Sequence, residues 1–250
     1  MSRSPIVRWI LQGFVAFALL AFSVVLTVFI VNVTYRYRAE SLLSDLQTLR
    51  VGKSTTADVQ RIMNRHGGST SPSYPSFCTP IDGAYDVWIG SQPIARLAQS
   101  IPFLRRFGLR PWGTAATVVL REGRVCFLSY SLAMEDPKGN WEWQIESTLL
   151  PEQMNEVLGT EHHGYRTGTQ DIRNFRILRS EVTPQATEEQ RREAFTYDLS
   201  CVTSFRGCRG RCQIAPLVWE KVYRESINEG GKMPLEETSD PHCKFAESTN

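Results

Sequence analysis

An uncharged run of 25 residues near the amino terminus is the strongest constraint on how this chain can fold. It extends from Trp9 to Val33 and reads WILQGFVAFALLAFSVVLTVFIVNV. About 20 apolar residues suffice to cross the hydrocarbon core of a bilayer as a helix. A cleavable signal peptide has a shorter apolar core, of ~7 to 15 residues, which ends at a small-x-small site. Because this run is longer and leaves through the sequence NVTY, we predict an uncleaved signal-anchor: a single-pass transmembrane helix over residues 9–33, preceded by a short tail over residues 1–8.

The residues that flank the run fit a membrane boundary but do not orient it. Trp9 lies at one end and Tyr35 and Tyr37 at the other, where interfacial aromatic rings are common. Basic residues occur on both sides, so the positive-inside rule does not decide which side faces the cytoplasm. The first cysteine is Cys78, so no lipoprotein-type cysteine follows the run.

The rest of the chain is electrically balanced. The sequence holds 28 Lys and Arg and 26 Asp and Glu, and residues 1–33 contain only Arg3 and Arg8, which leaves 26 basic against 26 acidic residues. Nucleic-acid-binding domains usually carry a net basic charge or a basic stripe. We therefore expect no nucleic acid partner.

Six cysteines occur beyond the anchor, an even number. Even sets in extracytoplasmic domains favour disulfide bonds, although six cysteines allow 15 pairings that sequence cannot distinguish. The other interpretation is a cytoplasmic domain with reduced, buried cysteines. The cysteines that could form disulfides are Cys78, Cys126, Cys201, Cys208, Cys212 and Cys243.

The sequence Gly52-Lys53-Ser54 matches the end of a phosphate-binding P-loop, but its context does not. The pattern requires a glycine five residues before the GK pair, following a buried strand, whereas Gln47 occupies that position after the amphipathic LLSDLQTL. Thr55 followed by Asp58 instead predicts a capping box that starts a helix ending near Gly67. Together with an amphipathic helix over residues 36–50, this predicts a helix pair. We expect neither a nucleotide nor a cofactor.

The same residues resemble a known family. The resemblance covers Leu46 to Gly68 and a later hairpin from Thr114 to Ser131, and it is to the SmpA/OmlA family of small lipoproteins. It implies two helices packed on a short antiparallel sheet, in a domain that binds rather than catalyses. The lipobox and the Leu-Gly-x-Pro end of the second helix are missing here. The matching positions are Leu49-x-Val51-Gly52, Lys53-Ser54-Thr55, Asp58-Val59, Ile62 and His66-Gly67-Gly68.

The remaining sequence predicts an α+β domain over residues 34–228. Strand patterns occur in IDGAYDVWI, in the hairpin TAATVVLR and RVCFLSYSLAM joined by Glu122-Gly123, and in NWEWQIESTL. A short helix and a polar loop follow, and then RNFRILRSEV and FTYDLSCVTSF are expected as strands around a turn of helix. IAPLVWEKVYRESINEGG predicts a closing helix. We expect an antiparallel sheet and a disordered tail over residues 229–250.

A basic amphipathic segment precedes the hairpin. No acidic residue lies between Asp86 and Glu122, while arginines alternate with apolar residues. Such a segment can lie in a membrane interface or contact an acidic partner, although packing on its own sheet is the commoner case. The candidate contact residues are Arg96, Arg105, Arg106, Arg110 and Trp112.

Two functions from different classes follow. The first is a non-enzymatic module of the cell envelope, anchored in the membrane, that binds a protein partner or the membrane surface. The second is a metal- or thiol-dependent enzyme that uses Cys201, Cys208 and Cys212. Zinc sites prefer CxxC knuckles and four ligands, and here the fourth would come from the tail, so we expect no metal and no catalytic residue.

Overall fold

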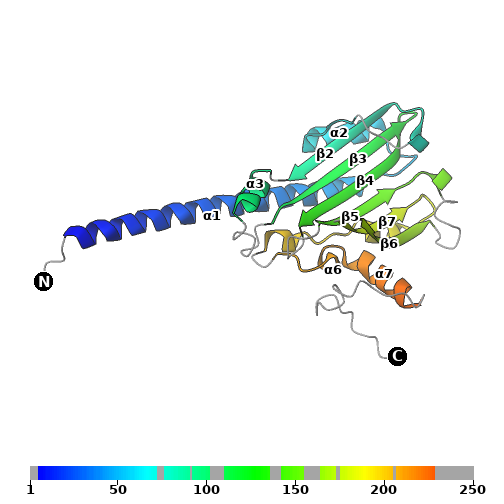
Figure 1. Ribbon diagram of the computed structural model, residues 1–250. Coiled ribbons are helices and arrows are strands. Elements are labelled where there is room, and N and C mark those ends of the chain that lie inside the picture. Colours follow the sequence, from blue (N-terminus) through cyan, green and yellow to red (C-terminus); the bar gives the residue numbers. More distant parts are fainter. Residues whose placement is uncertain are drawn as a thin grey trace.

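The described chain starts with a single helix of 42 residues, α1 (Pro5–Leu46), whose first half projects out of the folded body (Figure 1). The computed structural model describes residues 5–71, 76–90, 92–101, 110–135, 142–154, 164–172, 175–204 and 207–228. The fold is α+β. The other elements are α2 (Thr56–His66), β1 (Ser69–Thr70), η1 (Ser76–Cys78), β2 (Gly83–Gly90), α3 (Gln92–Ser100), β3 (Trp112–Arg121), β4 (Arg124–Glu135), β5 (Glu142–Leu149), η3 (Glu152–Met154), β6 (Tyr165–Ile172), β7 (Phe175–Val182), α5 (Glu188–Ala194), η5 (Ser200–Thr203), α6 (Arg211–Ile214) and α7 (Pro216–Asn228).

The strands form one mixed sheet of seven strands in the order β1-β2-β3-β4-β5-β7-β6. All neighbours are antiparallel except β5 and β7, which run parallel. The prediction of a purely antiparallel sheet is therefore wrong at this pair. The reason is topological: the chain leaves β5, forms β6 at the edge of the sheet, and returns as β7 into the space between them.

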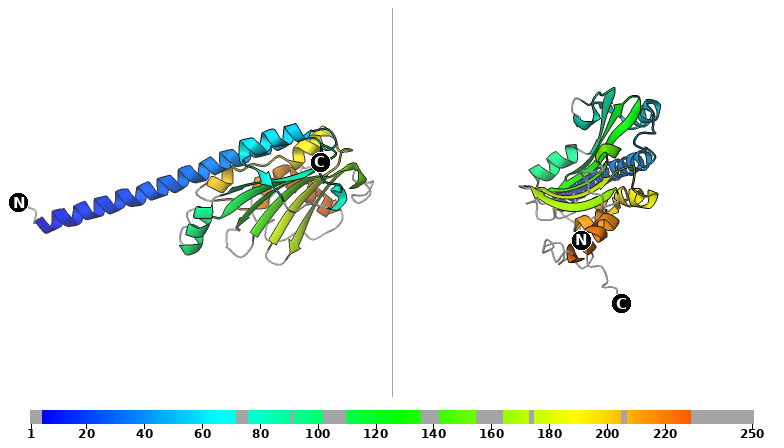
Figure 2. Two further views of the ribbon diagram at one scale, coloured as in Figure 1. Left: turned by 90° about the horizontal axis from the view of Figure 1, so that it is seen from above. Right: turned by 90° about the vertical axis from the view of Figure 1, so that its right-hand side faces the viewer.

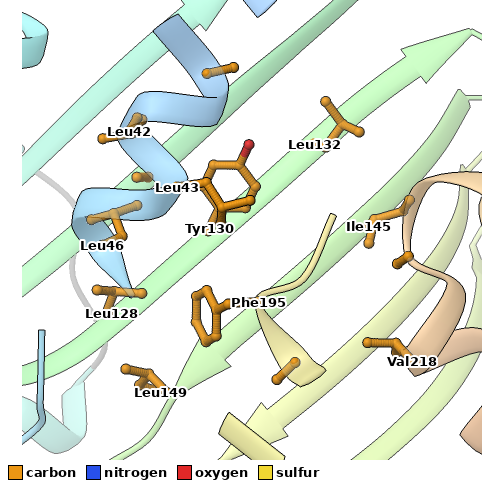
Figure 3. Packing of buried hydrophobic residues seen from close by; sticks show 14 of the residues in the cluster. Leu42, Leu43, Leu46, Leu128, Tyr130, Leu132, Ile145, Leu149, Phe195 and Val218 are labelled. Carbon is orange, nitrogen blue, oxygen red and sulfur yellow. The ribbon is translucent and has the colours of Figure 1, made fainter. Parts of the chain in front are cut away.

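Helices cover one face of this sheet (Figure 2). Along β4 the side chains of Leu128, Tyr130 and Leu132 are buried, while the intervening Ser129 and Ser131 are partly exposed. This period of two is expected for a sheet with one face on the core. From α1, Ala39, Leu42, Leu43 and Leu46 pack on the same face, and Figure 3 shows the three leucines beside Tyr130 and Leu128. Each fully buried leucine contributes about 1.5 to 3 kcal/mol relative to exposure.

A buried polar network fixes α5 beneath the sheet. The Ser147 hydroxyl on β5 donates to the carbonyl oxygen of Ala194 and contacts the hydroxyls of Ser180 and Tyr197. Burial raises the pKa of Tyr197, so its hydroxyl stays protonated and can donate to Ser147. One hydroxyl can donate once and accept twice, so all three contacts of Ser147 are satisfied.

The GKST segment forms a turn that leads into α2. Thr55 is the N-cap of α2, and its side chain and that of Asp58 form both hydrogen bonds of a capping box, as predicted. These hydrogen bonds with Thr55 lower the pKa of Asp58. Gly52 has φ 74° and donates its N–H to the carbonyl of Val125, while Lys53 and Ser54 donate theirs to Arg50. The three amides thus bond to carbonyls within the protein rather than pointing at a common anion.

The carboxyl end of α2 is tied to α1. The helix stops at Gly67, which adopts the left-handed conformation with φ 76° that favours glycine. Asp45 on α1 contacts His66 Nε2 at 2.7 Å and Arg65 at 3.1 Å. These bonds hold the two helices together over the sheet.

Two segments differ from the sequence prediction. β6 was expected as a polar loop; it is an edge strand, which can carry polar residues on both faces because only Tyr165 must reach the core. Residues 195–205 were expected as a strand, but the chain there is irregular until η5. Its buried residues Phe195, Leu199 and Val202 recur at intervals of four and three rather than two, and Asp198 accepts from the N–H of Ser200, which turns the chain.

The capping box supplies a test of this fold. Replacement Thr55→Ala removes the side-chain acceptor for the Asp58 N–H and is expected to lower the free energy of unfolding by about 1 kcal/mol. A urea titration followed by circular dichroism in detergent measures this. Gln60→Ala, an exposed change on the same helix, is the matched control and should leave the midpoint unchanged. Equal stability of Thr55→Ala and the wild type would contradict the importance of the cap.

Candidate functional site

The end of the domain from which α1 emerges carries the features that bear most directly on function. Fourteen large apolar side chains between Trp9 and Ile30 are 45 to 75% exposed, an apolar surface far larger than soluble monomers present. Hydroxyls within this part of the helix are satisfied internally, since Ser23, Thr27 and Thr34 bond carbonyls four residues earlier. The helix is long and apolar enough to cross a membrane.

Among the α1 side chains whose burial is described, from Trp9 onward, the first that is buried in the domain is Asn32. Its Oδ1 accepts a hydrogen bond from Trp112 Nε1 at 2.7 Å, and its Nδ2 donates to the carbonyl of Val202 at 3.5 Å. Trp112 starts β3 and Val202 lies in η5, so one amide joins the anchor to two parts of the domain. Only Val31 separates Asn32 from the exposed apolar surface that ends at Ile30.

Basic and aromatic side chains follow on the next turn of α1. Arg36 pairs with Glu40 at 2.8 Å and donates to Thr203 Oγ1 at 3.2 Å. The guanidinium of Arg38 lies over the Tyr35 ring, 5.9 Å from its centroid, and Tyr37 is 61% exposed. Cations and amphipathic rings at the end of an apolar span are typical of a headgroup region.

The predicted contact residues are only partly brought together here. Helix α3 lies near the point where α1 leaves the domain (Figures 1 and 2), with Arg96 exposed and Ile101, just after it, 45% exposed. Arg110 donates to the carbonyl of Cys208 at 2.9 Å, at the same end. Trp112 is buried and holds Asn32, so it acts on the anchor from inside the domain. Arg105 and Arg106 lie outside the described residues.

Acidic groups also occur at this end of the sheet. Glu135 at the end of β4 lies opposite Glu142 at the start of β5. Burial raises the pKa of Glu142, and the neighbouring charge of Glu135 raises it further. As the pH falls, Glu142 therefore takes up a proton earlier than an isolated glutamate would, and the pair carries less negative charge than two independent carboxylates.

Two disulfide bonds whose cysteines both lie in the described part of the chain tie loops to the domain. Cys78 pairs with Cys126 across 48 residues, beside the edge-to-face rings of Phe77 and Phe127. Cys201 pairs with Cys208, which closes a short loop that contains Val202. The carbonyl of Cys208 in this loop accepts the hydrogen bond from Arg110. Cys212 has no free thiol, and Cys243 lies outside the described residues.

The cysteine cluster considered for an enzyme has a different arrangement from a metal site. A sulfur in a disulfide is not a thiolate and does not ligate zinc. Among the residues that the structure describes, no three His, Cys, Asp or Glu side chains gather as a metal site would require. His162, His163 and His242 lie outside those residues.

A second polar site, missed by sequence reasoning, lies at the other end of the domain part of α1. A pocket of about 500 Å³ opens between the carboxyl end of α1 and α5. Arg50, four residues after the end of α1, and Arg191 from α5 both line it, although they are far apart in the chain. No local pattern brings them together, since only the sheet topology does. The lining residues are Leu46, Gln47, Arg50, Leu149, Glu188, Glu189, Arg191, Arg192 and Phe195.

Comparison with known proteins finds no counterpart: no family model, no curated protein and no solved structure matches the chain. The likeness to the SmpA/OmlA family therefore stays a prediction.

The bond between Asn32 and Trp112 can be tested by a double-mutant cycle. Asn32→Leu leaves the buried Trp112 N–H without its acceptor, and we expect it to cost about 1 to 3 kcal/mol of domain stability. Trp112→Phe should cost less in the Asn32→Leu background than in the wild type, with a coupling energy of roughly 0.5 to 3 kcal/mol. Urea unfolding in detergent, followed by circular dichroism, gives the four values.

Gln12→Leu is the matched control, because Gln12 lies on the exposed part of the same helix. It should leave the unfolding of the domain unchanged. Additive effects of Asn32→Leu and Trp112→Phe would show that the two side chains do not act together.

Proposed function

We propose that this protein is a single-pass membrane protein of the cell envelope whose α+β domain is seated on the bilayer surface and binds it without catalysis. The supporting observation is the continuity of α1, which runs unbroken from an exposed apolar surface into the hydrophobic core. A flexible linker would let the domain move away from the bilayer, whereas a continuous helix holds it at a fixed distance and orientation.

The length of the exposed apolar part agrees with this position. Residues 9–30 form 22 residues of helix, or about 33 Å, close to the ~30 Å of a hydrocarbon core. Asn32, buried in the domain, then falls at the headgroup level. The finer proposal is that the membrane boundary lies at residues 30–32, with the end of the domain directly on the headgroups.

The side chains at this end suit a bilayer surface. Arg38 on α1, Arg96 on α3 and Arg209 after the disulfide loop are exposed around the exit of α1, and Ile101 offers an apolar group next to α3. Each arginine near an anionic surface contributes about 1 kcal/mol of attraction. Their neighbours Arg36 and Arg110 form bonds within the domain. These two arginines therefore hold the end of the domain together rather than reach out to a headgroup.

The disulfides support an extracytoplasmic position for the domain. Disulfides persist in oxidising compartments and are rare in the cytosol of most organisms. The two disulfides belong to different hydrophobic clusters of the domain, since Cys208 lies in one and Cys78 and Cys126 in the other. They therefore have the place of structural bonds rather than of one reactive pair.

Thiol labelling in native membranes tests the compartment. Without reductant, we expect a maleimide of high mass to label none of the six cysteines after denaturation; after reduction it should label all six. A cytoplasmic Cys-containing protein of the same membrane is the control for labelling. Six reactive thiols without reductant would overturn the extracytoplasmic proposal and favour a thiol- or metal-dependent function.

Hydrogen exchange of α3 tests the seat on the bilayer. The full chain is placed in nanodiscs of anionic or of zwitterionic lipid, and exchange of the amides in residues 92–101 is followed by mass spectrometry. We expect protection to be about fivefold greater with anionic lipid, since one arginine contributes about 1 kcal/mol, and Arg96→Glu should remove the difference.

Arg61→Glu is the control for this experiment, because Arg61 is an exposed arginine on α2. It should keep the difference between lipids. Equal exchange of α3 in both lipids would contradict contact with the headgroups, and protection by an added envelope extract alone would favour a protein partner in its place.

A further inference from the structure

The pocket between α1 and α5 has a charge arrangement that its own residues do not complete. Its floor is apolar, because Leu46, Leu149 and Phe195 are buried in the core. Its rim is polar and carries three arginines against two glutamates. The pocket lies at the carboxyl end of α1 and includes no residue of α3, so its chemistry is separate from that of α3.

Two guanidinium groups share one carboxylate at this rim. Glu188 Oε2 lies 2.8 Å from Arg50 Nη2 and 4.0 Å from Arg191 Nε. The second distance is too long for a hydrogen bond. Within the described residues, the buried Nε of Arg191 has no hydrogen-bond partner.

The two arginines are held in place, whereas the carboxylate is not. Arg50 donates from Nη1 to the carbonyls of Gln47 and Leu49, at the carboxyl end of α1. The Arg191 side chain is only 11% exposed. Glu188, in contrast, is 74% exposed in its side chain and can swing into water without disturbing the core.

The electrostatics agree with an incomplete site. Burial lowers the pKa of Arg191, and the neighbouring charge of Arg50 lowers it further, against the opposite effect of Glu188. A second negative charge between these guanidinium groups would relieve that repulsion. Glu189, the other acid at the rim, does not supply this charge, because its carboxylate lies 4.0 Å from the exposed Arg192.

We propose that this pocket binds a carboxylate that carries an apolar group, held by Arg50 and Arg191 over the floor of Leu46, Leu149 and Phe195. Guanidinium groups present forked N–H donors that match a carboxylate, and the floor accepts an adjoining alkyl or aromatic group. Glu188 occupies part of the site in the unliganded protein and is displaced by the ligand. The carboxylate can come from a free amphiphilic acid or from the carboxyl terminus of a peptide. This inference goes beyond the proposed function and does not depend on the seat on the bilayer.

Titration of the full chain in nanodiscs tests the site with two probes, hexanoate and N-acetyl-leucyl-phenylalanine. Their amides are neutral controls that partition into lipid in the same way. The readout is the ¹⁵N resonance of the Arg191 Nε–H group, assigned by its loss in Arg191→Gln. We expect at least one acid, and neither amide, to shift this resonance in a saturable manner. Saturation by hexanoate identifies a small acid as sufficient, whereas saturation by the dipeptide alone identifies a peptide terminus.

Variants distinguish a binding site from a structural ion pair. Glu188→Gln removes the internal competitor and should tighten binding of the acid by roughly tenfold, the effect of one charge-assisted hydrogen bond. Arg191→Gln should weaken it by at least the same factor, followed through the Arg50 resonance. Arg224→Gln, an exposed arginine paired with Glu220 on its own helix, is the control and should bind as the wild type does.

The proposal fails if neither acid shifts the Arg191 resonance, if the amides shift it equally, or if Glu188→Gln binds no more tightly than the wild type. The Glu188→Gln result stands even if Arg191→Gln does not fold, because Glu188 is exposed and its loss leaves the core intact. Unfolding midpoints of all variants establish which of them fold.

Discussion

The structure depends on one helix whose two parts carry different surfaces. In the first part of α1 the apolar side chains are exposed on all sides, as a helix in lipid requires. In its last part only one stripe is apolar, and that stripe forms the centre of the domain core. The change occurs at Asn32, the one polar side chain of this region that is buried, and its amide finds partners in β3 and η5. Without these partners, a buried amide would oppose docking of the helix.

The rest of the end of the domain from which α1 emerges is organised around this junction. Trp112, which bonds Asn32, also starts the strand that follows the basic segment. The disulfide loop of Cys201 and Cys208 presents Val202 to Asn32 and the carbonyl of Cys208 to Arg110. Closing this loop reduces the number of conformations open to the unfolded chain. Helix α1, the loop and the start of β3 are therefore one structural unit, although they come from three distant parts of the sequence.

Local patterns predicted the parts of the fold that depend on local physics. The long apolar run, the capping box of Thr55 and Asp58, and the hairpin around Glu122-Gly123 each depend on neighbouring residues, and each was found where expected. β6 was missed because an edge strand does not need a continuous apolar face. The parallel pairing of β5 with β7 was missed because strand order is set by the chain's return path. The segment from Phe195 to Ser204 has a composition typical of a strand, but its buried residues do not alternate, and the chain there forms no strand.

The same distinction separates the two candidate sites. Arg96, Arg110 and Trp112 lie within one segment, so their composition indicated a surface even though Trp112 proved to be internal. Arg50 and Arg191 meet because the sheet topology returns the chain beneath the end of α1. Ser147 and its hydroxyl partners hold the end of α5 there, and Gln47 donates to the carbonyl of Phe195. The continuous α1 gives these two sites a fixed relation: Asn32 lies where the helix enters the domain, and Arg50 lies 18 residues further along the chain, beyond the opposite end of the docked helix. A ligand in the proposed pocket would therefore contact the carboxyl end of the same helix whose first part is long and apolar enough to cross a membrane, and its binding energy would add to the packing that holds α1 in the domain.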